Sequence, residues 1–203
     1  MRPVLFILLL IINADNFMLM QNSQITIDSN YTFEEAVADL EFPVEIKKQL
    51  TIIDVLYFGF DEKIHKGQLV ISRLLSGEVK EIFDRILAAR FPIEKVIPIV
   101  KYGWDDNKSM QDNNTSAFNY RVIAGTGELS NHSYGTAIDI NPKLNPFIKG
   151  KTILPKNGSY NKSEKGTLTP ESVVVKLLKK KGWTWGGSWR SRKDYQHFEK
   201  ADK

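Results

Sequence analysis

The strongest helical pattern in the chain spans residues 76–89. Apolar residues recur there every three or four positions, so that a helix would carry them on one face. This predicted core face consists of Val79, Ile82, Phe83, Ile86 and Leu87. A second helix is predicted over residues 170–181, because a proline opens the segment and Gly182 can end it.

Two shorter helical segments are predicted nearer the N-terminus. Thr32 can cap a helix that runs to about Leu40, since Glu35 follows three residues later as in a capping box. Residues 43–50 predict another short helical turn. Both segments precede the first predicted strand.

A β-hairpin is predicted next. The apolar residues 52–58 and 68–72 favour strands on either side of a polar turn at residues 61–63. His65 falls near this turn and outside any recognisable motif, and we expect it to be a plain exposed residue. Residues 93–100 then predict an edge strand, because Pro98 has no N–H for a ladder hydrogen bond.

The rest of the chain predicts more strands and two long polar segments. Residues 104–115 and 143–169 are predicted to form loops, the second long enough to have a function of its own. Helices and mainly hairpin-connected strands in one small domain predict an α+β fold, with a small, mainly antiparallel sheet and flanking helices. The further strand candidates are residues 118–123, 136–140, 183–189 and 195–199.

Length and composition narrow the class of protein. A chain of 203 residues, 42% of them hydrophobic, can bury one core but not several. The absence of cysteine excludes disulfides, cysteine-bound zinc, iron–sulfur clusters and a thiol nucleophile. Any metal site must therefore use carboxylates and the three histidines, His65, His132 and His197.

The first residues are typical of an export signal. Residues 1–12 carry one positive charge and then a run of apolar residues, which is the length of a signal-peptide core and short for a membrane span. No clear cleavage pattern follows, so an uncleaved N-terminal anchor and a buried N-terminal helix or strand are alternatives. The predicted organisation is a leader or anchor at residues 1–20, a helical extension at 21–50 and the main domain at 51–203.

Charge is unevenly distributed along the chain. Residues 143–203 carry 15 basic and 5 acidic side chains, whereas residues 1–142 carry 13 and 19. A basic C-terminal third can attract an anionic polymer such as nucleic acid, a membrane surface or an acidic cell-wall component. Lys179, Lys180 and Lys181 have a plainer explanation, since positive side chains stabilise the C-terminal end of a helix.

Two histidines lie in polar segments that are candidates for chemistry. His132, His197 and one carboxylate would suit Zn²⁺ and leave a fourth position for a water whose pKa the ion lowers. Asp139 is the best carboxylate, because on a strand its side chain points away from those of its isoleucine neighbours and needs a partner. A hydrogen-bonded His–Asp pair without metal is the alternative.

The order of the motifs resembles the zinc D-alanyl-D-alanine carboxypeptidase family. This family includes D,D-carboxypeptidases of the vancomycin-resistance type and L-alanyl-D-glutamate peptidases of phage endolysins. The resemblance rests on S-x-H-x-x-G-x-A-x-D-I-N-P at residues 130–142 and on D-x-x-H-F at residues 194–198. Residues 114–121 and 185–187 add to it, and it extends over about residues 51–199. It implies a zinc peptidase domain with a hedgehog/D-Ala-D-Ala-peptidase-like fold.

The resemblance also implies which residues form a metal centre. His132, Asp139 and His197 would bind one Zn²⁺, and Asp194 would be the general base that takes a proton from the attacking water. Some relatives carry Glu in place of Asp194, so the shorter side chain asks for a slightly different geometry. Glu199 is the less favoured candidate for the base.

Two further residues take roles from the resemblance. Arg121 would polarise the scissile carbonyl and stabilise the oxyanion, and Ser116 would contact the substrate. Without the resemblance, the expected explanations are a surface salt bridge and a turn hydrogen bond. Trp183, Trp185 and Trp189 are expected to belong partly to the core and partly to the wall of the cleft.

From the sequence we expect an exported zinc peptidase that acts on the stem peptides of peptidoglycan, most simply a D-alanyl-D-alanine carboxypeptidase. The alternatives are an L-alanyl-D-glutamate endopeptidase and a non-catalytic wall-binding module on the same scaffold. Nucleic acid is not expected as a partner, because no recognisable binding module is present. The protein is expected to be a periplasmic or extracellular monomer, with membrane contact only through an uncleaved leader.

Overall fold

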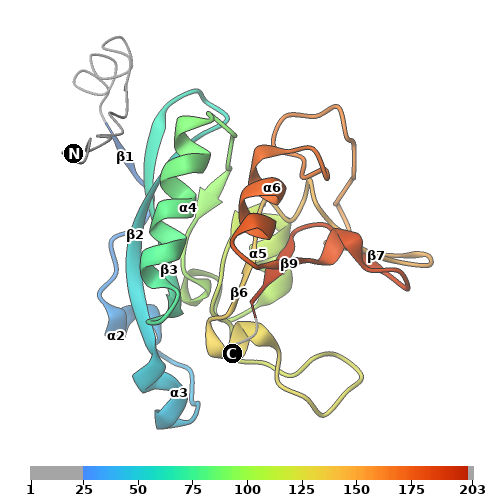
Figure 1. Ribbon diagram of the computed structural model, residues 1–203. Coiled ribbons are helices and arrows are strands. Elements are labelled where there is room, and N and C mark those ends of the chain that lie inside the picture. The colour runs from blue at the N-terminus through green and yellow to red at the C-terminus, as the bar shows by residue number, and fades with distance from the viewer. Residues whose placement is uncertain (1–24, 201–203) are drawn as a thin grey trace, which may run out of the picture.

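The computed structural model describes residues 25–200 (Figure 1). The leader or anchor predicted at residues 1–20 lies outside the described residues. Within the described part of the chain, no helix has the length and apolar character to cross a membrane. Helices and small sheets are mixed along the chain, which confirms the predicted α+β class.

Short helices connect and cover the strands. The α-helices are α2 (Phe33–Ala36), α3 (Val44–Gln49), α4 (Ser76–Ala88), α5 (Asp106–Gln111) and α6 (Val173–Lys180). The 3₁₀ helices are η1 (Ile99–Tyr102), η2 (Asn131–Tyr134) and η3 (Gly186–Ser188).

The strands form several small sheets instead of the single sheet expected. Their orders are β1-β3-β2, β10-β7-β8, β6-β11-β9 and the pair β4-β5; β1 with β3 and β4 with β5 are parallel, and the other pairs are antiparallel. The strands are β1 (Thr26–Ile27), β2 (Leu50–Phe58), β3 (Ile64–Ser72), β4 (Lys95–Val96), β5 (Asn114–Thr115), β6 (Ala137–Asp139), β7 (Phe147–Lys149), β8 (Thr152–Leu154), β9 (Thr184–Trp185), β10 (Lys193–Asp194) and β11 (His197–Glu199).

The main core lies between two layers. The predicted hairpin is confirmed as β2 and β3, and α4 packs against it, while α6 packs beside the sheet that contains β6, β9 and β11 (Figure 1). Side chains from both layers meet in one buried cluster, among them Ile82, Ile86, Ile138, Leu178 and Phe198. The sheet that carries two of the candidate metal ligands is therefore fixed against the rest of the domain by apolar burial.

Helix α4 confirms the predicted amphipathic pattern with one exception. Val79, Ile82, Phe83 and Ile86 are buried, but Leu87 is only half-buried. Leu87 lies at the edge of the apolar face, where the helix surface already turns toward solvent.

The N-terminal extension packs on the outer side of the hairpin. The predicted capping box is present, since the Thr32 hydroxyl accepts from the Glu35 N–H and the Glu35 carboxylate accepts from the Thr32 N–H. The helix ends at Ala36 and not near Leu40, and Asp39 adopts a left-handed φ of 57° that a continuing helix cannot contain.

The edge strand predicted at residues 93–100 is much shorter. Only Lys95–Val96 pairs with another strand, and Pro98 begins η1. The Ile97 N–H donates to Asn114 Oδ1 at 2.9 Å, and the Ile97 carbonyl accepts from Asn114 Nδ2 at 2.8 Å. An amide side chain thus takes the place that a neighbouring strand would have occupied.

The prediction that residues 104–115 form a loop is wrong. This segment contains helix α5, whose first turn is capped by the Asp105 carboxylate accepting from the Lys108 N–H at 3.1 Å. Strand β5 follows at once. The sequence did not predict α5 because its residues are mostly polar and show little apolar periodicity.

The strand predicted at residues 118–123 is not formed, because these residues do not pair with a neighbouring strand in a ladder. The Phe118 N–H donates to the Val70 carbonyl, the Asn119 N–H to the His132 carbonyl and the Arg121 N–H to the Ser133 hydroxyl. These acceptors belong to only two segments, β3 and η2, and a single isolated antiparallel bridge links Val122 to Leu129, so residues 118–123 join no sheet.

The C-terminal third differs from expectation mainly in the lengths of its elements. The long segment at residues 143–169 is not all loop, since it contains the hairpin of β7 and β8. Helix α6 begins at Val173, with Ser172 as its cap, and ends at Lys180. The predicted strands at 136–140, 183–189 and 195–199 are confirmed only over β6, β9 and β11.

Candidate metal centre

The backbone brings three predicted site residues onto one face of a small sheet. In the antiparallel pair of β6 and β11, Asp139 lies opposite His197. On the other side of β6, Ser116 and Asp139 exchange two backbone hydrogen bonds, at 3.1 and 2.9 Å. Residues directly opposite each other in a ladder point to the same face, so Ser116, Asp139 and His197 lie side by side.

His132 reaches the same place from the 3₁₀ helix η2. The Ser130 hydroxyl caps this helix by accepting from the His132 N–H at 3.3 Å. Gly135 ends it with a left-handed φ of 64°, and a Cβ there would lie only 2.6 Å from the Ser72 backbone nitrogen. Glycine is therefore required where η2 closes against the hairpin.

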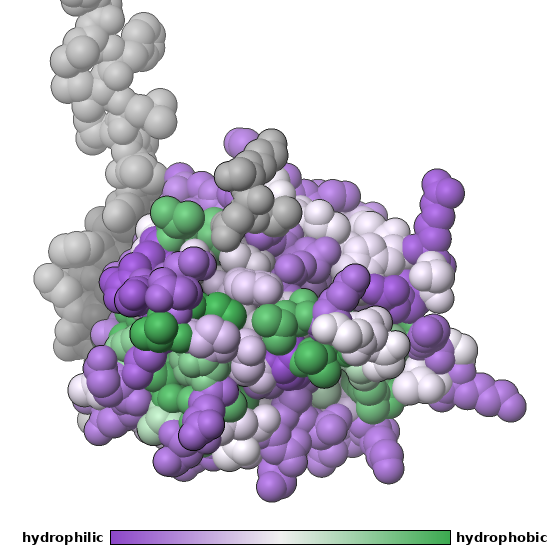
Figure 2. Space-filling view, turned by 90° about the horizontal axis from the view of Figure 1, so that it is seen from below, coloured by the Kyte–Doolittle hydropathy of each residue, from purple (hydrophilic) through white to green (hydrophobic). Residues whose placement is uncertain are grey.

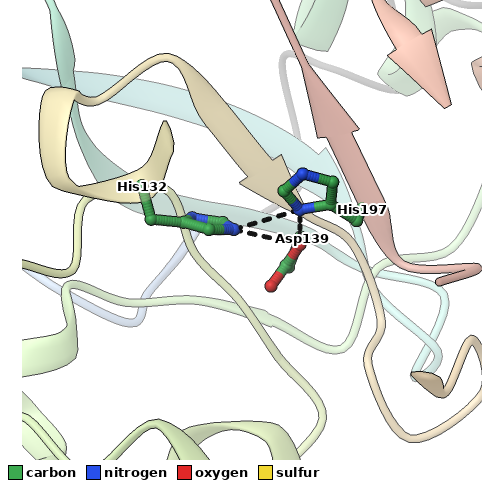
Figure 3. Close-up of side chains that lie close together, drawn as sticks. All are labelled: His132, Asp139 and His197. Carbon is green, nitrogen blue, oxygen red and sulfur yellow. Dashed lines mark hydrogen bonds and ion pairs between the residues drawn. The ribbon is translucent and has the colours of Figure 1, made fainter. Parts of the chain in front are cut away.

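Figure 3 shows the three side chains pointing toward one another from η2, β6 and β11. His197 Nδ1 lies 3.0 Å from Asp139 Oδ1, and His132 Nε2 lies 3.3 Å from the same oxygen. The two ring nitrogens are 3.2 Å apart. All three residues are buried, and one donor atom from each lies within 4.8 Å of the others.

The outward nitrogens of both imidazoles already have partners. His132 Nδ1 lies 2.5 Å from the Ala117 carbonyl oxygen, which can only accept, so this nitrogen must donate. His197 Nε2 lies 3.0 Å from a Glu199 carboxylate oxygen, and Asn131 holds that oxygen in place at 2.7 Å. In the neutral rings, the inward nitrogens therefore carry lone pairs, and with Asp139 they form three converging electron-pair donors. The residues fit a metal cation.

Charge in the cluster points the same way. Burial would raise the pKa of Asp139, but the neighbouring His132 and His197 hold it well below its usual range. Burial would likewise lower the pKa of His197, but its hydrogen bonds to Asp139 and Glu199 raise it to about 10. Without an ion, the cluster thus retains a proton, and a bound divalent cation would take that proton's place.

Asp194, the predicted base, lies on β10 beside this centre. Burial and the nearby charge of Asp139 raise the pKa of Asp194 to about 6. The Gln196 side-chain amide donates to Asp194 Oδ1 at 3.2 Å, a contact that the sequence did not predict. A Cβ on Gly186 would stand 2.8 Å from the Asp194 Cβ, so the glycine allows η3 to pack directly against Asp194.

The backbone of Arg121 lies beside η2, which carries His132, but its side chain contacts a residue outside the candidate centre. Its backbone N–H donates to the Ser133 hydroxyl, next to His132. The guanidinium forms an ion pair with Asp106 of α5 at 3.1 Å, and the side chain is 35% exposed. Asp106 was not a predicted site residue, because residues 104–115 were expected to form a loop.

The tryptophans divide as expected between core and site. Trp183 and Trp185 are buried in the main cluster. The Trp189 ring is half-buried, with its centroid 5.5 Å from that of the His197 ring. Trp189 therefore lies against a candidate ligand.

The expectation that His65 is a plain exposed residue is wrong. Its side chain is only 13% exposed, and its two ring nitrogens each lie 2.9 Å from a carboxylate oxygen, of Asp28 and of Asp61. The His65 ring also stacks on Tyr57, whose hydroxyl donates to Asp28. His65 lies on β3, in the hairpin, and belongs to a cluster of its own.

Comparison with known proteins agrees with this geometry. Residues 124–200 match a family model described as D-alanyl-D-alanine carboxypeptidase. His132, Asp139, Asp194 and His197 fall inside the matched segment. No solved structure matches the chain. This match confirms the resemblance drawn from the sequence over residues 124–200, and it indicates a hydrolytic peptidase as the function of this segment.

Proposed function

We propose that the protein is a zinc-dependent peptidase that hydrolyses the stem peptides of peptidoglycan, with removal of the terminal D-alanine as its main reaction. One observation carries the proposal. Three buried donor atoms from His132, Asp139 and His197 converge within 4.8 Å, inside the segment that matches the peptidase family. Two imidazoles and one carboxylate form a ligand set that suits Zn²⁺ and leaves a coordination position open.

The protein's own residues would supply positioning and proton transfer. Bound Zn²⁺ would act as a Lewis acid and make a water molecule more acidic. The Ala117 carbonyl and Glu199 hold the two imidazoles in the tautomers that a metal requires. Asp194, with a pKa raised to about 6, would be ionised at neutral pH and ready to accept a proton from the attacking water.

Ser116 and Arg121 would act on the substrate. Ser116 shares the sheet face of Asp139 and His197, so a peptide lying across that face would meet its side chain. Arg121 would stabilise the negative charge that develops on the scissile carbonyl oxygen. Its ion pair with Asp106 would hold the guanidinium in one orientation between turnovers.

The remaining parts of the proposal follow from the substrate. Peptidoglycan lies outside the cytoplasm, so we propose an exported, monomeric protein, with residues 1–20 as leader or anchor. The hedgehog/D-Ala-D-Ala-peptidase-like fold belongs to the same proposal, supported by the family match of residues 124–200.

The test is mass spectrometry of purified muropeptides incubated with the zinc-loaded protein, beside an Asp194→Asn variant. We expect the wild-type protein to release terminal D-alanine and the variant to lose about a hundredfold or more of this activity, since it lacks the proton acceptor. Zinc content is measured in both samples, so that a loss of activity is assigned to the base and not to the metal.

Other outcomes would change the assignment. Cleavage between L-alanine and D-glutamate would make the protein an endopeptidase. Intact stems with bound zinc in the wild-type sample would contradict a peptidase and leave a wall-binding module. An Asp194→Asn variant that retains both zinc and full turnover would exclude Asp194 as the base.

A further inference from the structure

A group of exposed basic residues lies at the edge of the candidate centre. We call the four side chains of Lys149, Lys151, Arg190 and Arg192 the basic rim. Lys149 and Lys151 lie at the tip of the β7–β8 hairpin, which projects from the body at the right of Figure 1. All four residues are exposed, and residues 143–163 contain five lysines and no acidic residue.

The charges of the basic rim are not neutralised within the described part of the chain. Some other cations of the protein have acidic partners there: Lys95 pairs with Asp112, Lys181 with Glu81 and Lys200 with Glu78. No rim residue forms an ion pair among residues 25–200. Unpaired cations in one place create a positive potential that attracts an external anion.

The basic rim is continuous with the candidate centre through the backbone. Strand β10 pairs with β7, with Lys193 opposite Ile148 and Asp194 opposite Phe147. Continuing this register by one residue places Arg192 next to Lys149. The strand that carries the proposed base therefore also fixes the position of the rim.

A second connection runs through an aromatic ring. The Arg192 guanidinium lies 4.4 Å from the centroid of the Trp189 ring, and that ring lies 5.5 Å from the His197 ring. Figure 2 shows long hydrophilic side chains projecting at its right-hand edge, the side on which Figure 1 places the hairpin. A polymer bound in the centre would thus extend over a cationic surface.

We propose that the basic rim binds carboxylates of the peptidoglycan polymer, on the stem peptides adjacent to the one being hydrolysed. This inference rests on the proposed function. A single exposed ion pair contributes little, but several contacts to one polymer reinforce each other because each raises the effective concentration for the next. The basic rim should therefore matter for polymeric wall and not for a single soluble muropeptide.

The experiment compares two double charge reversals of equal size. Lys149→Glu with Lys151→Glu alters the basic rim, and Lys176→Glu with Lys179→Glu alters exposed lysines of α6 as the matched control. Co-sedimentation with purified peptidoglycan sacculi measures binding to the polymer. We expect the rim variant to bind about tenfold more weakly and the control to bind like the wild type. Both variants should hydrolyse a soluble muropeptide within about twofold of the wild-type rate, since the rim lies outside the metal centre.

Chemical treatment of the sacculi identifies the partner group. Amidation of their carboxylates with a carbodiimide should abolish the difference between wild type and rim variant. Removal of phosphate-containing wall polymers with hydrofluoric acid should leave it unchanged. If phosphate removal abolishes it instead, or if DNA competes better than muropeptide polymer, the assigned partner is wrong.

Two further results would contradict the proposal that the basic rim binds the polymer. Equal loss of binding in the α6 control would mean that net charge and not this surface is responsible. Loss of activity on the soluble muropeptide in the rim variant would place these residues in the reaction centre. Failure of the proposed function is distinguishable, because the wild-type protein would then hydrolyse no muropeptide while its sedimentation with sacculi could still be measured.

Discussion

The two histidine clusters of this protein combine the same side-chain types in different arrangements. In the hairpin, one imidazole, His65, lies between two carboxylates, and both its ring nitrogens are 2.9 Å from an oxygen. In the candidate centre, His197 also lies between two carboxylates, Asp139 and Glu199, but a second imidazole, that of His132, converges on the same Asp139 oxygen. The inward nitrogens of the two imidazoles face each other at 3.2 Å.

The two clusters differ in how many lone pairs of their nitrogen and oxygen atoms lack a proton to accept. An ionised carboxylate only accepts, so His65 donates from both nitrogens and is complete as an imidazolium. In the centre, one proton cannot satisfy two facing nitrogens and an oxygen, so lone pairs converge. The convergence of a second imidazole on the same carboxylate, and not the number of carboxylates, thus distinguishes the candidate metal centre from the ion-paired cluster of His65.

Among the substitutions that test this difference between the two clusters, Asp139→Asn is expected to have the largest effect, which is loss of stabilisation by zinc. Without the carboxylate charge, the two imidazoles alone should not retain zinc. Free zinc at a thousandfold above its Kd stabilises a protein by about 4 kcal/mol, and the variant should lose this gain. Thermal unfolding with and without zinc measures it. A His65→Gln variant serves as the control and should keep the full zinc effect, whereas equal zinc stabilisation in Asp139→Asn would refute the ligand set.

A smaller loss of zinc binding is expected from a change at Glu199, which contacts the candidate ligand His197. Glu199 accepts from His197 Nε2 and is held by Asn131. Glu199→Gln removes the negative charge that orients the ring, so zinc affinity should fall by about tenfold to a hundredfold. Competition with a fluorescent zinc chelator gives the Kd. Glu128→Gln, a change at an exposed acid, should leave the affinity unchanged, and an unchanged Kd in both variants would remove Glu199 from the support of the metal.

The sequence predicted the centre better than it predicted the fold around it. The resemblance to a known family grouped His132, Asp139 and His197, because its motifs occupy two short stretches of the chain, residues 130–142 and 194–198. Periodicity also identified the hairpin and α4, whose apolar faces fill the main core. These features depend on residues near one another in the chain.

What the sequence did not predict depends on distant partners. Asn114 satisfies the backbone of Ile97 in place of a strand, and Asp106 takes the guanidinium of Arg121. His65 meets Asp28 only because β1 pairs with β3, a contact between segments 37 residues apart. No local pattern marks such side chains as partners, since a single polar residue in a loop has many possible neighbours.

The smallest expected effect concerns His65 in the hairpin, whose protonation should contribute to the stability of the fold. Burial would lower the pKa of His65, but its hydrogen bonds to Asp61 and Asp28 outweigh burial and raise it. A raised pKa in the folded state means that the protonated ring stabilises the fold fully below the unfolded pKa of about 6.5. This stabilisation is then lost as the pH rises through the folded-state pKa.

Urea unfolding of the wild type and of His65→Gln at pH 6 and pH 9 measures this contribution. The charged groups that face the ring are Asp28 and Asp61, with Lys63 paired to Asp61 and Tyr57 stacked on the ring. Because Asp61 is half exposed, we expect the wild type to exceed the variant by about 1 kcal/mol at pH 6, with a smaller difference at pH 9. A difference that is equal at both pH values would mean that packing on Tyr57, and not the imidazolium, holds the cluster together.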